Sequence, residues 1–226
     1  MRQILGFCGQ GLEALRGAMI EGSQFVFGYL AGGKTPYLSH NPSASFIFAF
    51  QAMPIIMVVS ALSMLLFHWG VLQRFITAVS FFFKKTLNIG GPLGVGGAAN
   101  IFLSQAEAGL LVKPYLKNLS RGEFFSFMVL GMATTVGSIL IVYATLLEGV
   151  VPQALSHLMT ASVINIPSAI LIARLMIPHG QRLTEGRVVQ PYHFSSSLDA
   201  VSEGTLQGLK LFWNVLAMLL VFVALI

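Results

Sequence analysis

Long apolar runs dominate the chain and predict four membrane-spanning helices. They cover residues 46–67, 124–147, 154–177 and 205–226, and each is close to the ~20 residues that a helix needs to cross a bilayer. Nearly every position of each run is apolar, as expected for helices that face lipid and other helices. Pro54 lies near the middle of the first run and predicts a kink there. Lys210 is the only charge of the last run, close enough to its end for the ammonium to snorkel to the membrane surface.

The segments between these runs are amphipathic or polar. Residues 1–45 contain an amphipathic stretch that predicts an interfacial helix, and the glycines and prolines at 32–42 then indicate a loop. Residues 68–88 have apolar positions at helical spacing and three basic residues, which predicts a second helix at or near the membrane surface. Residues 178–202 read as a polar connector before the last run.

Composition narrows the class of protein. The 226 residues are 55% hydrophobic and only 9% charged, against about 25% charged residues in an ordinary soluble domain. These values exclude a soluble domain and intrinsic disorder. The net charge of +5 comes from basic residues scattered between apolar runs, which is typical of cytoplasmic loops and not of nucleic-acid binding. We therefore predict an all-α, multi-pass protein of the cell (inner) membrane, with the lipid bilayer and no nucleic acid as a partner.

The sequence offers no support for enzymatic chemistry. Cys8 is the single cysteine, which excludes an internal disulfide, and no His/Cys cluster has the spacing of a zinc site. No nucleophile–base constellation stands out either. We predict that the protein is not an enzyme and uses no cofactor.

One glycine-rich segment combines apolar character with polar residues at its centre. Residues 90–119 read GGPLGVGGAANIFLSQAEAGLLVKPYLKNL and carry Asn100, Gln105 and Glu107 in the middle. Unwound backbone and a carboxylate at membrane depth persist only inside protein or beside a water-filled cavity. We predict two half-helices that meet at an SQAE turn, a re-entrant hairpin of the kind that lines transport sites. The alternative is a surface loop with a solvated Glu107, which the flanking IFL and AGLLV runs disfavour.

A small hydroxyl patch lies in the second apolar run. Thr134, Thr135 and Ser138 fall within the small-residue stretch GMATTVGS. Hydroxyls and free carbonyls suit a hard cation such as sodium. Hydroxyls also bond back to their own helix, and small residues allow close helix packing. The residues alone leave both interpretations open.

The hairpin segment also resembles a known family. NIFLSQAEAGLLVKPYL at 100–116 is similar to the NIF-x-GQTEAPL-x-x-PYL motif of the concentrative nucleoside transporters. Further segments resemble that family in the same order: FVFGYL at 25–30, the FAFQ stretch at 48–73, GMATTVGSILIVYA at 131–144, LMTASVINIPSAILIARLMIP at 158–178 and LFWNVLAMLLVFVALI at 211–226. The resemblance covers nearly the whole chain.

This resemblance implies a homotrimeric symporter that moves nucleosides together with sodium or protons. Each subunit would combine a scaffold with a mobile transport domain. The motif carries substrate contacts over to Gln105, Ala106, Glu107 and Ile139. It carries sodium ligands over to Asn100, Leu103 (through its carbonyl), Thr134, Thr135 and Ser138.

The chain departs from the family in its motif and in its length. Ser104 replaces a glycine, Ala106 replaces a threonine or serine, and Gly109 replaces a proline, so base selectivity and the coupling ion stay open. Family members have further helices before this region and a second half that holds the ribose. We expect that half to come in cis or in trans. Two alternatives are a transport or gate module for another solute, such as a metal ion, and an inactive truncated copy.

The predicted organisation follows from these segments. It consists of an interfacial helix and loop (1–45), a scaffold span with a surface helix (46–88), the re-entrant hairpin (89–120), a pair of transport-domain spans (121–178), the polar connector (179–202) and the start of a scaffold span (203–226).

Overall fold

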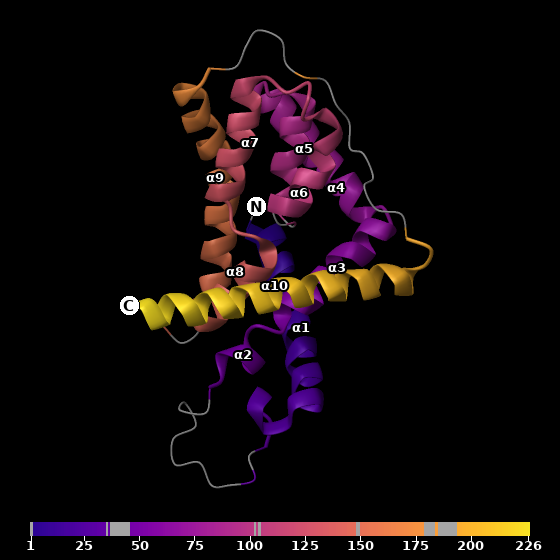
Figure 1. The fold of residues 1–226 in the computed structure, drawn as a ribbon, viewed down its shortest axis with the longest axis vertical. Coiled ribbons are helices and arrows are strands. Elements are labelled where there is room, and N and C mark those ends of the chain that lie inside the picture. Colours follow the sequence, from indigo (N-terminus) through magenta and orange to yellow (C-terminus); the bar gives the residue numbers. More distant parts are fainter. Residues whose placement is uncertain are drawn as a thin grey trace.

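The computed structural model describes residues 2–34, 36, 46–101, 103, 105–147, 150–178, 184 and 194–226, and these form helices and turns with no strand among them (Figure 1). Within these residues, four helical segments are long and apolar enough to cross a membrane: Phe48–His68, Arg121–Leu146, Ala154–Met176 and Ser197–Leu225. The prediction of an all-α protein with four spans is confirmed. The loop predicted at 32–42 and the connector at 178–202 fall largely outside the described residues.

The first half of the chain supplies the predicted amphipathic helices. The predicted interfacial helix is α1, Arg2–Phe27, followed by the short helix η1, Gly28–Ala31. The first span consists of α2, Phe48–Gln51, and α3, Ile55–His68. Pro54 is the residue that caps the start of α3, so the expected kink is a full break, because proline lacks an N–H and fits best at a helix start. The helix predicted at or near the membrane surface is α4, Val71–Leu87.

The hairpin consists of α5, Gly91–Ala99, and α6, Gln105–Val112, continued by η3, Lys113–Tyr115. Every residue of α5 is buried, and α4 and α7 (Arg121–Ala133) pack against it. The glycines of this segment belong to a continuous helix. A Cβ at Gly96 would lie 2.6 Å from the Phe127 ring, and one at Gly94 would lie 2.8 Å from Ser80 Oγ. They are glycines because neighbouring helices approach too closely for a side chain.

A buried carboxylate ties the base of the hairpin to its neighbours. Ser120 and Glu123 form a capping box at the start of α7, and Glu123 is fully buried. Its carboxylate accepts hydrogen bonds from the Ser120 N–H (2.9 Å), the Thr184 N–H (2.9 Å) and the Thr184 hydroxyl (2.7 Å). The Thr184 carbonyl in turn accepts from the Gly91 N–H at 2.9 Å. Segments distant in sequence are thereby fixed at the start of α5.

The second span is interrupted at its centre. After α7, residues Thr134 to Val136 leave the helix, and α8 resumes over Gly137–Leu146. Thr134 and Val136 have extended backbone angles. The third span, α9, Ala154–Met176, is continuous through Pro167 and packs along α7. Arg174 of α9 donates to the carbonyls of Leu87 (2.6 Å) and Asn88 at the end of α4.

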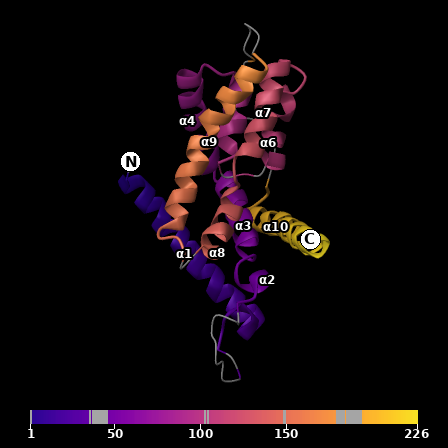
Figure 2. The same ribbon diagram turned by 90° about the vertical axis from the view of Figure 1, so that its left-hand side faces the viewer.

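The last helix, α10, Ser197–Leu225, runs across the long axis of the molecule, as the two perpendicular views show (Figures 1 and 2). It lies against α3. Gly204 and Gly208 permit this close packing, because a Cβ at either would lie 2.7 Å from a Cα of α3. The helix starts six residues before the predicted boundary at 203, because the Ser196 hydroxyl accepts from the Asp199 N–H and caps it.

Candidate functional site

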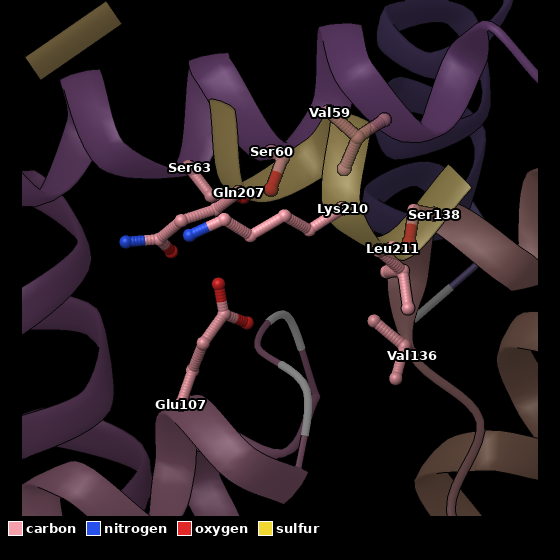
Figure 3. A pocket seen from close by; sticks show the side chains of 9 residues that line it. All are labelled: Val59, Ser60, Ser63, Glu107, Val136, Ser138, Gln207, Lys210 and Leu211. Carbon is pink, nitrogen blue, oxygen red and sulfur yellow. The ribbon is translucent and has the colours of Figure 1, made fainter. Parts of the chain in front are cut away.

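A pocket of about 190 Å³ lies where the hairpin meets α3, α8 and α10 (Figure 3). Glu107 reaches into it from α6, and its carboxylate points toward the side-chain ends that come from α10. Residues of four elements and of the break before α8 line the pocket: Val59, Ser60, Ser63, Glu107, Val136, Ser138, Gln207, Lys210 and Leu211. The wall is therefore assembled from segments up to 150 residues apart in sequence.

The start of α6 places the polar residues of the hairpin. Gln105, Ala106 and Glu107 form the first residues of α6, so the prediction that they make the turn itself is wrong. The turn spans residues 100–104, of which Phe102 and Ser104 fall outside the described part. In the first helical turn, the positive end of the helix dipole favours the Glu107 carboxylate.

Asn100 and Gln105, at the two sides of the hairpin turn, are joined by a hydrogen bond. Asn100 is 2% exposed, and its Nδ2 donates to Gln105 Oε1 at 3.1 Å. Gln105 Nε2 contacts Met128 Sδ at 3.9 Å. Gly131 of α7 makes room for this arrangement, since a Cβ there would overlap the Gln105 amide group. Among the described residues, Asn100 Oδ1 has no hydrogen-bond partner, which is costly for a buried carbonyl oxygen unless a ligand satisfies it.

The predicted hydroxyls lie around the break between α7 and α8, and of these Ser138 shares the pocket with Glu107 of the hairpin. The Thr134 hydroxyl donates to the Leu130 carbonyl at 2.9 Å, as the packing interpretation expects. Asn165 of α9 donates to the Ala133 carbonyl at 3.2 Å. Ser138 is 4% exposed and lines the pocket together with Val136. Unwound backbone at mid-span is the arrangement by which transporters expose carbonyls to ions.

The structure brings some predicted residues together and separates others. Glu107 and Ser138 share the pocket, and Asn100 and Gln105 share a hydrogen bond. Leu103 is buried in the core cluster around the hairpin. Ile139 packs against a second cluster formed mainly by α1, α3, α8 and α10 and is not a lining residue of this pocket.

The sequence pattern missed the α3 and α10 side of the pocket. Ser60 and Ser63 look like ordinary small residues of the first apolar run. Gln207 lies near the start of the last apolar run, before its uncharged part. Lys210 did give a signal, because it is the only charged residue of the last run. Lys210 lies near the middle of the 29-residue α10, just before its uncharged apolar part, and lines the pocket.

The donor atoms around the hairpin suit a weakly held hard cation. They are amide, hydroxyl and backbone oxygens, which are the ligands that hard cations such as sodium prefer. Within the described residues, no group of three or more His, Cys, Asp or Glu side chains could hold a metal ion. Such a cation would therefore be bound mainly by neutral oxygens.

A helical hairpin and an interrupted span beside a pocket with polar residues are features of secondary transporters. Family models agree: "Nucleoside recognition" matches residues 49–149, and "Na+ dependent nucleoside transporter C-terminus" matches residues 157–226. The chain belongs to the concentrative nucleoside transporter family. It is an integral membrane protein of a family of transporters, not enzymes.

Individual relatives cover the chain nearly from end to end. An uncharacterized transporter of Haemophilus influenzae is 36% identical over 211 residues, which are 91% of this chain and 47% of that protein. Nucleoside permease NupC of Helicobacter pylori is 30% identical over 225 residues, 100% of this chain and 52% of the permease. The structure of CNTnw in an inward-facing substrate-bound state superposes with a TM-score of 0.88 at 31% identity, over 100% of this chain and 51% of CNTnw. The chain thus spans about half the length of these relatives.

Proposed function

We propose that the chain forms the cation-binding and base-binding half of a nucleoside:cation symporter. Gln105, Ala106 and Glu107 at the start of α6 would contact the nucleobase, with Ile139 as a predicted further contact. The cation would bind beside them, held by Asn100, the Leu103 carbonyl, Thr134, Thr135 and Ser138. The complete carrier would be a homotrimer in which a second half, in cis or in trans, holds the ribose.

The observation that carries this proposal is the buried side chain of Asn100. Its Oδ1 has no partner among the described residues, and its Nδ2 positions Gln105. A cation at Oδ1 would satisfy the oxygen and polarise the amide, which strengthens the hydrogen bond to Gln105. Binding of the ion would thereby orient a group that contacts the base. This link gives a physical reason for symport.

Sodium fits this site better than a proton does. An amide oxygen does not take up a proton near neutral pH, whereas it is a suitable ligand for a hard cation. The interruption of the second span would leave backbone carbonyls available as further ligands. Proton coupling would instead have to use Glu107, and the ion dependence of uptake distinguishes the two.

The test is uptake of labelled uridine or adenosine into vesicles that contain the full gene product. We expect uptake to follow an inward sodium gradient and to be lost when choline replaces sodium. Glu107→Gln should reduce uptake strongly, because the carboxylate would accept hydrogen bonds from the base. Unchanged uptake and ion dependence in Glu107→Gln would contradict the site assignment.

Other results would favour the alternative functions. A protein that is stabilised by another solute, such as a metal ion, but not by any nucleoside would be a transport or gate module of different specificity. A protein that binds no solute would fit an inactive copy. Thermal unfolding with and without each solute separates these outcomes.

A further inference from the structure

Lys210 occupies an unusual place for a lysine. It lies near the middle of α10, one of the candidate spans, and no other charged residue follows Glu203 in the sequence. An ionisable residue within a candidate span generally faces a protein interior or a water-filled cavity and pairs with another polar group. The position of Lys210 therefore calls for a partner.

The pocket supplies a partner of opposite charge. Of its nine lining residues, only Glu107 and Lys210 carry charge. Figure 3 shows the Glu107 carboxylate pointing from α6 across the pocket toward the ends of the Lys210 and Gln207 side chains. The two charges come from elements about a hundred residues apart, so only the tertiary fold brings them face to face.

The position of Lys210 is fixed by the packing of its helix. Gly208, two residues earlier, contacts α3 so closely that a Cβ would lie 2.7 Å from the Cα of Met57 and 2.9 Å from Ser60 Cβ. Ser60 itself lines the pocket. The helix therefore cannot rotate or slide freely, and the lysine stays on the pocket side of α10.

We propose that Lys210 is the counter-charge of Glu107, a fixed cation that α10 contributes to the solute site. The pair makes the pocket electrically neutral overall, which suits an uncharged solute such as a nucleoside and disfavours an anionic nucleotide. The role in the solute site rests on the proposed function, whereas the pairing of the two charges does not. Lys210 then belongs to the specificity-determining residues of the pocket, although it lies outside the hairpin motif.

The pairing is tested by the electrostatic potential at position 210. In a Cys8→Ser background, Lys210→Cys is modified with cationic aminoethyl and anionic sulfonatoethyl methanethiosulfonate, and the ratio of the two rates is measured in membranes containing the full gene product. Because a facing carboxylate attracts the cationic reagent, we expect Glu107→Gln to lower this ratio about tenfold. Any effect of the carboxylate on the reactivity of the thiol itself cancels in the ratio.

Two further variants keep this test decisive. Lys117→Cys, at an exposed lysine outside the pocket, should give a ratio that does not respond to Glu107→Gln. If Lys210→Cys does not fold, Gln207→Cys reports on the same pocket with the lysine in place, and its ratio should fall in the same direction. A ratio at position 210 or 207 that is unchanged by Glu107→Gln overturns the pairing.

The role in the solute site is tested by chemical rescue. Lys210→Cys should lower uridine uptake about tenfold, since it removes the proposed counter-charge of Glu107 from the pocket. The aminoethyl reagent restores an ammonium and should recover most of the uptake, whereas neutral methyl methanethiosulfonate should not. A purely structural role would not distinguish the charged from the neutral reagent. If both reagents act alike, Lys210 is not part of the solute site.

The two arms separate the failure of this inference from that of the proposed function. If the unmodified protein takes up no nucleoside in any ion gradient, the proposed function is wrong, and the rate ratio still decides whether Glu107 faces Lys210. If the unmodified protein transports uridine but the ratio does not respond, the proposed function stands and the counter-charge is rejected.

Discussion

Replacing Gly131 by alanine tests whether the buried Asn100–Gln105 pair prepares the base site. Gly131 faces the hairpin from α7, and an added Cβ would overlap the amide group of Gln105. The methyl group cannot be accommodated by a small shift, because all three heavy atoms of the amide lie within 2.5 Å of it. Gln105 must therefore swing away from Asn100.

The expected magnitude follows from the contacts that are lost. Departure of Gln105 breaks its 3.1 Å hydrogen bond with Asn100 and leaves a second polar atom of that buried side chain unpaired. Such a loss costs about 1–3 kcal/mol. Alanine regains about 1 kcal/mol over glycine in a helix, so the free energy of unfolding should fall by no more than about 2 kcal/mol. If the contact of an oriented Gln105 with the base contributes about 1.4 kcal/mol to the free energy of binding, its loss would lower nucleoside affinity about tenfold.

The assay compares Gly131→Ala with a matched variant in the same hairpin. Gly109 of α6 has no atom within 4 Å of an added Cβ, so Gly109→Ala should leave affinity unchanged and raise stability slightly. Thermal unfolding gives stability, and the dependence of the melting temperature on uridine concentration gives affinity. Wild-type affinity in Gly131→Ala, or an equal loss in both variants, would refute the reasoning.

Three further substitutions test how the helices are held around the site. Glu123→Gln should lower the free energy of unfolding by about 2–4 kcal/mol, because a buried amide cannot accept all the hydrogen bonds that Ser120 and Thr184 donate to the carboxylate. Thr184→Val should lower it by only about 1 kcal/mol. Equal losses of stability for the two variants in thermal unfolding would contradict this account. Gly208→Ala should lower the free energy of unfolding by about 1–3 kcal/mol, because the added methyl group forces α10 away from α3. Gly22→Ala has open space around its Cβ and should leave the free energy of unfolding unchanged. A Gly208→Ala protein as stable as the wild type would show that the two helices separate easily. Arg174→Met should speed amide hydrogen exchange at the end of α4, where two carbonyls lose their donor, and exchange at the wild-type rate would show that this cap does not hold the helix end.

Local features of the sequence were enough to predict the elements of this fold. Runs of apolar residues near bilayer length identified four spans, and Pro54 marked the break in the first one. Both signals depend only on residues adjacent in the chain, since hydropathy and the missing proline N–H act locally. The same holds for the hairpin. Glycines and a central Glu107 within an apolar segment predicted that its backbone does not face lipid.

Features that depend on distant neighbours could not be predicted in this way. The interruption at 134–136 has no proline to announce it. Gly131 looks like any small residue until Gln105 is seen to occupy the space beside it. Hydropathy placed Lys210 near one end of the last apolar run, but its position in a pocket with Glu107 depends on how α10 packs against α3.

The sequence by itself determined that this is a helical membrane protein with a polar hairpin and the motif of a nucleoside transporter. Only the tertiary structure decided that α10 crosses the molecule against α3 and places Lys210 in one pocket with Glu107. The physical reason is that the apolar residues a helix needs in order to lie in lipid can be recognised in each segment of the sequence separately. The pairing of charges, in contrast, depends on which helix faces meet, and here close contacts between glycines and backbone fix those faces.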